Sequence, residues 1–364
     1  MTTNIQLGKQ ENDSDVLLDV NDLTVAFPTD DGVVQAVRGV TYQLRRGEAL
    51  GIVGESGSGK SVSSMAVMGL LPKNARITGS VRFQGEQLLG KTDNQYSRIR
   101  GNKIAMIFQD PLTSLNPVYN VGFQIAEAVL AHNDISKREA RDRAIELLRV
   151  VGIPFPEQRV DNYPHEMSGG MRQRVVIAIA MANNPDVIIA DEPTTALDVT
   201  VQAQVLEALE AARAETGAAL VLITHDLGVI AGHVDRICVM YAGKLVEKGS
   251  IDDIFYRPRM PYALGLLGSL PRLDSSRKQR LSPITGAPPS LVNLPPGCPF
   301  TPRCPLAQEI CERSEPELLS VEGVNHQAAC HFHEKLVGVS ARQLFGTSSA
   351  DPDLMDAVDE EVAQ

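Results

Sequence analysis

The stretch Gly54-Glu55-Ser56-Gly57-Ser58-Gly59-Lys60-Ser61 decides the fold of this chain. An apolar run, Ala49 to Val53, precedes it, and the pattern from Lys60 to Leu71 predicts a helix. A strand, then G-x-x-x-x-G-K-S, then a helix is the context of a phosphate-binding loop, whose inward N–H groups and helix dipole bind phosphate. Lys60 would reach the outer phosphates and Ser61 would ligate Mg²⁺. The stretch therefore predicts a nucleotide site; the alternative is a Gly/Ser turn between two elements.

Three further apolar runs each end at a polar residue. They are Ile104 to Phe108 before Gln109, Val187 to Ala190 before Asp191-Glu192, and Ala218 to Ile223 before Thr224-His225. Continuous apolar runs of this length are typical of strands in a parallel sheet that is covered on both faces. Because ligands of such sheets bind beyond the carboxyl ends of the strands, we expect these polar residues to converge on the phosphate loop.

Each of these polar residues suits one role in nucleotide hydrolysis. Asp191 would hold Mg²⁺, and the Gln109 amide would contact both Mg²⁺ and the attacking water. Glu192, one residue after Asp191, would point to the other face and activate that water as general base. His225 would bond the γ-phosphate and position the water, although a single histidine after a strand is more often structural.

Composition limits the class of protein. The chain has 364 residues, 43% of them apolar, and a net charge of −11, which argues against nucleic acid as the main partner. Six acidic residues and no basic residue lie in the last eighteen positions, so the rest is only mildly acidic. The polar N-terminus has no signal-peptide pattern, and no run of eighteen apolar residues occurs. We expect a cytosolic protein that does not span a membrane.

A second glycine-containing loop resembles an anion socket. Ser168-Gly169-Gly170-Met171 comes directly before an apolar helical pattern. A helix that opens with Ser-Gly-Gly offers free backbone N–H groups to an anion, although it could equally be a simple cap. Since no second lysine accompanies it, we expect this loop to serve a nucleotide that is held by another subunit.

Four of the five cysteines lie close together near the C-terminus. Cys298, Cys304, Cys311 and Cys330 follow the spacing C-x5-C-x6-C-x18-C, which lacks the paired C-x2-C of a zinc ribbon. Four thiolates at irregular spacing fit an iron–sulfur cluster, with the [4Fe–4S] form favoured. The alternative is a group of reduced, buried thiols. Cys238 lies in a strand-like run and is expected in the core.

The order of these motifs resembles the ATP-binding subunits of ABC transporters. The matching residues are the phosphate loop, Gln109, Ser168-Gly169-Gly170, Asp191-Glu192, Ala196-Leu197-Asp198 and His225. Such domains pair head to tail, so the resemblance implies that Ser168, Gly169, Gly170 and Met171 contact ATP on a partner and that Asp198 lies in the dimer loop. It also implies that Phe27 stacks on adenine, where spacing alone favours a core phenylalanine. Met171 replaces the glutamine of most members.

The resemblance also implies an architecture. We expect an α/β P-loop NTPase core of the ABC type, with an antiparallel β-hairpin subdomain, a helical insert and a small cysteine-containing appendage. The expected boundaries are a flexible leader at 1–16, the ATPase domain at 17–260 with the insert at about 112–183, the appendage at 261–335 and an acidic, disordered tail at 336–364. Three prolines between Arg257 and Pro271 predict a linker that leaves the ATPase core.

A narrower resemblance is to the dipeptide and oligopeptide permease branch. It is carried by Gln109-Asp110-Pro111-x-x-Ser114-Leu115-Asn116-Pro117, by Ser168 to Met171, and by Gly297-Cys298-Pro299-Phe300-x-x-Arg303-Cys304-Pro305 with Cys311 and Cys330. The branch implies an ATPase with ATP and Mg²⁺ at the cytoplasmic face of the membrane, powering peptide import. It also points to a [4Fe–4S] cluster on the four cysteines. The same motifs occur in importers of nickel and other small solutes, which stay open as the alternative.

The resemblance further implies partners. We expect a second ABC ATPase subunit, either a distinct paralogue or a second copy, two transmembrane permease subunits and, indirectly, an extracytoplasmic solute-binding protein. Two other classes of ATP-binding protein predict different features. A soluble ABC ATPase acting on nucleic acid or ribosomes predicts two cassettes or a basic patch, and a regulatory module that binds ATP without hydrolysis predicts loss of Glu192 or His225. The sequence has none of these features.

Overall fold

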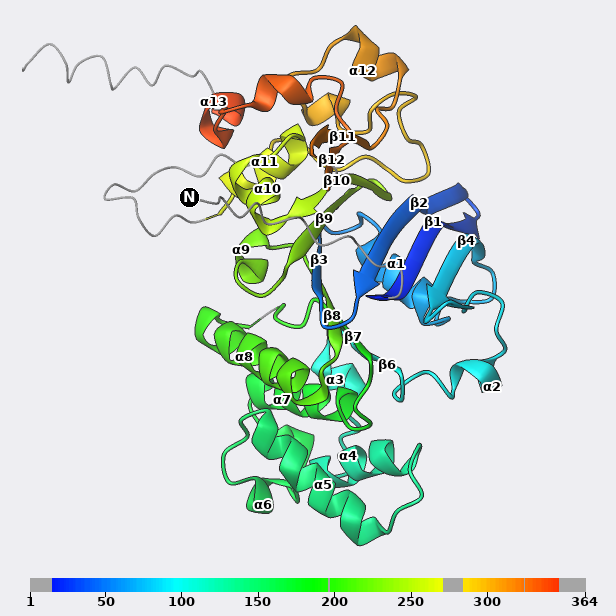
Figure 1. The fold of residues 1–364 in the computed structure, drawn as a ribbon, viewed down its shortest axis with the longest axis vertical. Helices are drawn as coiled ribbons and strands as arrows, with labels where there is room; N and C mark the ends of the chain where they lie inside the picture. The colour runs from blue at the N-terminus through cyan, green and yellow to red at the C-terminus, as the bar shows by residue number, and fades with distance from the viewer. Residues whose placement is uncertain (1–14, 196, 271–283, 324, 347–364) are drawn as a thin grey trace, which may run out of the picture.

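The computed structural model describes residues 15–195, 197–270, 284–323 and 325–346 (Figure 1). Most of the expected leader and most of the acidic tail therefore lie outside the described residues, as does Ala196. Within the expected tail, residues 341–345 form helix α13 (Ala341–Phe345), whose Phe345 packs against the main core. The expectation of disorder is therefore wrong for this part of the tail.

The larger sheet contains the predicted parallel strands. Its order is β11-β12-β10-β9-β3-β8-β7-β6, and the pairs β6–β7, β7–β8, β3–β8 and β3–β9 are parallel. The parallel strands are β3 (Ala49–Val53), β6 (Ile104–Ile107), β7 (Val187–Asp191), β8 (Ala219–Thr224) and β9 (Arg236–Tyr241). Nearly all of their residues are buried, as continuous apolar runs predict. The carboxyl ends of β3, β6, β7 and β8 meet at one edge.

A second, antiparallel sheet has the order β2-β1-β4-β5. Its strands are β1 (Val16–Thr29), β2 (Gly32–Arg45), β4 (Arg76–Phe83) and β5 (Glu86–Gln87). The long β1–β2 hairpin turns at residues 30 and 31, and its apolar face shares a core with one face of the larger sheet. This arrangement confirms the expected hairpin subdomain.

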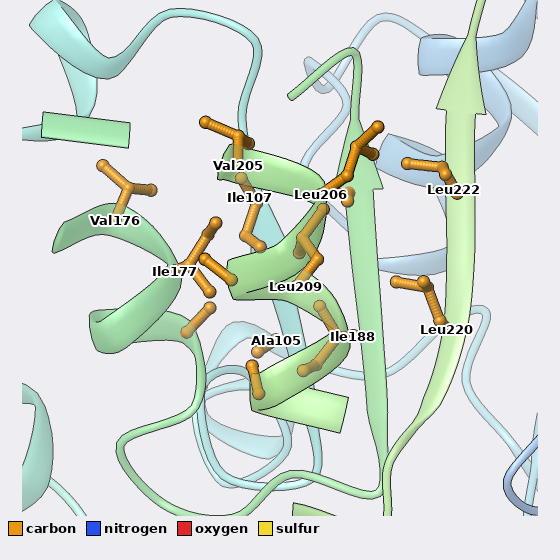
Figure 2. Packing of buried hydrophobic residues seen from close by; sticks show 14 of the residues in the cluster. Ala105, Ile107, Val176, Ile177, Ile188, Val205, Leu206, Leu209, Leu220 and Leu222 are labelled. Carbon is orange, nitrogen blue, oxygen red and sulfur yellow. The ribbon is translucent and has the colours of Figure 1, made fainter. Parts of the chain in front are cut away.

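Helices cover the parallel strands and extend beyond them. Figure 2 shows Val176 and Ile177 of α7 (Gly169–Ala180) and Leu206 and Leu209 of α8 (Val199–Thr216) gathered over the strands. The segment between β6 and β7 is helical apart from its connecting loops, and it forms the lower part of Figure 1. Besides α7 it contains α3 (Pro111–Ser114), α4 (Val121–Leu130), α5 (Lys137–Val150), α6 (Pro156–Arg159) and a 3-10 turn at Pro164–Glu166. The remaining helices of the core are α1 (Lys60–Val67), α2 (Asp93–Tyr96) and α9 (Leu227–Ile230).

The C-terminal part continues the larger sheet. Strand β10 (Lys244–Ser250) pairs with β12 (His326–Ala328), which pairs with β11 (Leu319–Glu322). Helices α10 (Ile251–Tyr256), α11 (Pro261–Gly268) and α12 (Glu309–Arg313), with 3-10 turns at Thr301–Arg303 and His333–Leu336, complete it.

The prediction of a linker after Arg257 is wrong. Pro261 starts α11 at its first turn, where proline fits a helix, and Tyr262 and Ala263 are fully buried in the main core. Proline here marks a helix start rather than an extended connection. Helix α11 is therefore packed on the core. None of the described helices is both long enough and apolar enough to cross a bilayer.

Candidate nucleotide-binding site

The phosphate loop joins β3 to α1, and its glycines are required by close backbone contacts. Gly54 and Gly59 have φ angles of +157° and +101°. A Cβ atom on Gly54 would lie 2.2 Å from the carbonyl oxygen of Met240, and one on Gly59 would lie 2.3 Å from that of Ala36. Any side chain at either position would collide with backbone. The loop is therefore enclosed by β9 and β2.

Lys60 is buried beneath this loop and bonded to its backbone. Its ammonium donates to the carbonyl oxygens of Gly54 at 2.7 Å and Glu55 at 3.0 Å, and the residue is only 4% exposed. Burial lowers the pKa of the ammonium, while the charges of Glu192 and Asp191 oppose that shift. The lysine is thus held in the loop, beside the acidic residues that end β7.

Ser61 and Asp191 form a pair of oxygen ligands at the end of the loop. The Ser61 hydroxyl donates to the Asp191 carboxylate at 2.9 Å, and Asp191 is the last residue of β7. Burial raises the pKa of this carboxyl group, although the bond from Ser61 lowers it. A hydroxyl and a carboxylate in contact suit Mg²⁺, which prefers oxygen ligands and is usually bound by few protein groups.

Glu192, the predicted general base, lies inside the site. The residue has a φ angle of +47°, so the chain leaves the extended conformation immediately after Asp191. Its carboxylate accepts hydrogen bonds from the Gln109 amide at 3.0 Å and the Thr195 hydroxyl at 2.9 Å. His225 Nδ1 lies 3.4 Å away on the same side.

These groups surround a cavity of about 470 Å³ that opens to solvent. It is lined by Glu55, Ser56, Gly57, Gly59, Lys60, Ser61, Val62, Gln109, Glu192 and His225. Asp191 lies directly behind Ser61, and Ser58 is buried in the loop. The structure thus brings together residues from the ends of β3, β6, β7 and β8 around one phosphate loop.

Three other predicted groups lie outside this cavity. Phe27 sits half-buried on β1 opposite Val34 and packs against the antiparallel sheet's core. Ser168 caps α7 by accepting a hydrogen bond from Met171 N at 3.3 Å. Asp198 caps α8 in the same way through Val201 N at 3.0 Å. Both caps are exposed, so they are accessible to another molecule but do not serve the cavity of their own chain.

Gly170 has a packing role that the sequence did not reveal. A Cβ atom on this residue would lie 2.3 Å from Cγ1 of Val201, whereas one on Gly169 would have its nearest neighbour, Leu197, at 3.7 Å. The close approach of α7 and α8 therefore depends on Gly170. Only knowledge of which helix packs against α7 could have indicated this.

Residues from the C-terminal part also reach the phosphate loop. The Tyr262 hydroxyl accepts a hydrogen bond from Glu55 N at 2.7 Å, and the Arg303 guanidinium holds the Glu55 carboxylate. Tyr241 joins them, because Arg303 also donates to its hydroxyl at 3.3 Å. Sequence reasoning missed these contacts, which span as many as 248 positions, and no local signal marks them.

The four C-terminal cysteines line one small, largely apolar cavity. Burial, with a smaller contribution from neighbouring thiols, raises the pKa of Cys304 to about 11 and that of Cys330 to about 12. Among the described residues, however, no group of three or more His, Cys, Asp or Glu side chains is arranged to hold a metal ion. The described residues therefore do not support the expected iron–sulfur cluster. Cys238 is fully buried in the core, as expected.

Comparisons with known proteins agree with this geometry. Residues 37–195 match the family model described as ABC transporter, and residues 246–311 match the model of the oligopeptide/dipeptide transporter C-terminal region. A solved dimeric ATP-binding cassette bound to ADP and phosphate superposes with a TM-score of 0.58 and 28% identity, covering 65% of this chain and 99% of that one. The match confirms the predicted fold class.

Curated relatives extend the match along the chain. The oligopeptide transport ATP-binding protein OppD of Mycobacterium tuberculosis is 57% identical over 90% of this chain, which spans only 54% of that relative. The protein of the same name from Bacillus subtilis is 50% identical over 87% of this chain and 89% of its own length. The one from Salmonella typhimurium is 52% identical over 83% of this chain and 90% of its own length. The chain therefore belongs to the ABC transporter family of ATP-binding proteins, in its oligopeptide and dipeptide transport branch.

Proposed function

We propose that this protein is the ATP-hydrolysing subunit of an importer that takes up dipeptides or oligopeptides. The observation that carries the proposal is the single cavity in which the phosphate loop, the Ser61–Asp191 pair and Glu192 face one another. The peptide substrate is supported by the relatives, which are oligopeptide transport ATP-binding proteins. Nothing in the comparisons favours the nickel or small-solute alternative.

We propose a role for each group in the site. The loop from Gly54 to Ser61 binds the phosphates of ATP. Lys60 contacts the outer phosphates, and Phe27 contacts adenine. Ser61 and Asp191 hold Mg²⁺, whose charge would offset that of the phosphates, and Gln109 reaches the same region from β6. These roles rest on the positions described above and on the family resemblance.

Hydrolysis is assigned to Glu192 with His225. Glu192 accepts a proton from the attacking water, and His225, 3.4 Å from its carboxylate, orients that water or the γ-phosphate. Gln109 and Thr195 donate to the same carboxylate oxygen at 3.0 Å and 2.9 Å. Because an acceptor held at two points keeps a fixed direction, this geometry suits a base that must face one water.

A second ATPase subunit completes the site. Ser168, Gly169, Gly170 and Met171 open α7 at an exposed helix N-terminus, which suits the γ-phosphate of ATP bound to a partner. Asp198 lies at the N-terminus of α8, which packs against α7, and would face the same interface. The partner is a second copy or a related, distinct chain.

Two transmembrane permease subunits are the proposed membrane partners, with a solute-binding protein acting through them. An open, mostly apolar groove of about 660 Å³ lies between α1, β6, α4 and α7. Phe108 in this groove is 42% exposed, directly before Gln109. A partner segment seated there would sense movement of Gln109 when ATP binds. The chain would thus sit at the cytoplasmic face of the membrane.

The cysteine cavity is the proposed place of a [4Fe–4S] cluster. Cys298, Cys304, Cys311 and Cys330 all line it, and the surrounding side chains are mainly apolar, which suits a cluster ligated only by thiolates. When bound, such a cluster would act as a structural cross-link. Assay of iron and sulfide in anaerobically purified protein tests this, and absence of both would leave the four cysteines as buried thiols.

The proposed division of the chain follows the same roles. Residues 17–260 are the ATPase domain with the insert at about 112–183, and residues 261–335 are the appendage. Affinity purification of the tagged chain from native membranes in mild detergent tests the function as a whole. Recovery of two multi-span proteins and a second ATPase supports the importer; recovery of ribosomes, or of nothing from the membrane, contradicts it.

A further inference from the structure

Glu55 is an unusual residue to find in a phosphate site. It is the second residue of the phosphate loop and lines the nucleotide cavity, yet its carboxylate would repel phosphate. The carboxylate is instead held by Arg303, with Nη1 to Oε2 at 2.6 Å and Nη2 to Oε1 at 2.8 Å. Two parallel bonds between a guanidinium and a carboxylate fix direction as well as distance.

Arg303 is held as firmly as its partner. The residue is 7% exposed and ends the 3-10 turn between Cys298 and Cys304. Its Nε donates to the carbonyl oxygen of Thr285 at 3.2 Å, and its Nη1 also donates to the Tyr241 hydroxyl at 3.3 Å. The bonds to Glu55 raise the pKa of the guanidinium above its ordinary value, so it stays charged.

The backbone of Glu55 is held from two further directions. Its N–H donates to the Tyr262 hydroxyl at 2.7 Å, and its carbonyl oxygen accepts from Lys60 at 3.0 Å. Tyr262 stacks at a tilt on Tyr241, with ring centres 4.5 Å apart, and both rings contact Phe300, two residues after Cys298. The start of the phosphate loop is therefore supported by the packed rings of Tyr262, Tyr241 and Phe300. Of these, Phe300 belongs to the cysteine-bearing segment.

We propose that Arg303 is a positioning residue for the phosphate loop, through which the cysteine-bearing segment at 297–311 sets the affinity for ATP. The inference rests on the proposed ATP binding at this site. Arg303 acts in two ways: it fixes the loop in one conformation, and it neutralises a carboxylate that would otherwise face the phosphates. A preorganised site loses less free energy when ligand binds. By linkage, bound nucleotide stabilises the segment in return.

The test is a double-mutant cycle on the affinity for Mg²⁺ and ATPγS, measured by calorimetry on the full chain. Arg303→Met leaves Glu55 unpaired and should raise Kd about tenfold. In the Glu55→Gln background, where no carboxylate remains to be neutralised or held, the same substitution should change Kd less than about twofold. An equal effect in both backgrounds, or none in the wild-type background, would overturn the proposal.

Two controls separate this role from a purely structural one. Arg313→Met removes an exposed pair with Glu309 on α12, just beyond the cysteine-bearing segment, and should leave Kd unchanged. In steady-state hydrolysis, Arg303→Lys should raise KM for ATP several-fold with kcat within twofold of wild type; a fall in kcat with unchanged KM would contradict positioning. Arg303→Lys also serves if the methionine variant does not fold. If wild type and Arg313→Met bind no nucleotide, the proposed function itself fails; if they bind normally and the cycle shows no coupling, only this inference fails.

Discussion

The carboxylate of Glu192 lies 3.8 Å from the ammonium of Lys60. The group assigned as general base and the group assigned to the phosphates therefore face each other across the nucleotide cavity. The side chain of Glu192 is only 12% exposed. A single short turn after β7 creates this relationship, because φ at Glu192 is +47°.

Replacing Glu192 by Gln should stop hydrolysis and preserve ATP binding. The amide keeps the size of the side chain but cannot take a proton from water, so we expect turnover to fall by at least about 100-fold. Phosphate release and ATPγS binding measure the two effects separately. Glu207→Gln, an exposed change on α8, is the matched control and should leave both hydrolysis and ATP binding unchanged. Unchanged phosphate release would remove Glu192 from this role.

Replacing Asp191 by Asn should stabilise the protein in the absence of nucleotide. Burial raises the pKa of this carboxyl group, which means that the folded state binds its proton more tightly than the unfolded state does. Ionisation at neutral pH therefore opposes folding, and this cost is relieved as the pH falls through the folded-state pKa. We expect a gain of about 1 kcal/mol in the free energy of unfolding at pH 7, typical of relieving a strained functional site.

Urea unfolding at pH 7, with and without Mg²⁺ and ATPγS, checks the Asp191 prediction. The gain should be confined to the nucleotide-free protein, because the amide is a weaker Mg²⁺ ligand than the carboxylate. The Ser61 hydroxyl can still donate to the amide oxygen, so that contact is retained. An Asn variant that is less stable than wild type without nucleotide would contradict the prediction.

Replacing Gly170 by Ala should destabilise the contact between α7 and α8. The new Cβ would lie 2.3 Å from Cγ1 of Val201, and overpacking of this kind costs about 1–3 kcal/mol. Gly169→Ala, with its nearest neighbour at 3.7 Å, is the matched control and should have a small effect. Thermal unfolding measures both.

A second change separates the packing role of Gly170 from its proposed role on a partner's ATP. Val201→Ala removes the colliding methyl group, so it should restore the stability of Gly170→Ala. If ATP hydrolysis also returns in the double variant, packing accounts for the glycine. If stability returns and hydrolysis does not, the residue is needed at the interface as well. A double variant no more stable than Gly170→Ala would contradict the packing argument.

The parallel sheet and its binding edge could be predicted from sequence because each depends on short, local patterns. An apolar run such as Val187 to Ala190 must be covered on both faces, and the polar residue after it then lies at the carboxyl edge. This pattern predicts that Gln109, Asp191 and His225 lie at the carboxyl edge of the sheet. Their convergence needs no knowledge of loops, since the order of parallel strands brings the ends together.

Other features depend on contacts that a local pattern does not contain. The φ angle of +47° at Glu192 comes just after the strand ends, where no local sequence pattern specifies it. The bond between Arg303 and Glu55 joins positions 248 apart. The three prolines between Arg257 and Pro271 favour a linker, yet Pro261 opens a buried helix because its position at the first turn needs no N–H donor.

The thiol of Cys238 should be unreactive in the folded protein, unlike that of an exposed cysteine. Burial in β9 raises its pKa to about 11, so at pH 8 only about one thiol in a thousand is the reactive thiolate, against about a quarter for an unfolded cysteine of ordinary pKa near 8.5. Because the shift is upward, native alkylation should rise about tenfold for each pH unit between 7 and 9. Iodoacetamide labelling followed by peptide mass mapping, native and in urea, measures this. Native labelling as fast as labelling in urea would contradict burial of Cys238 in the core.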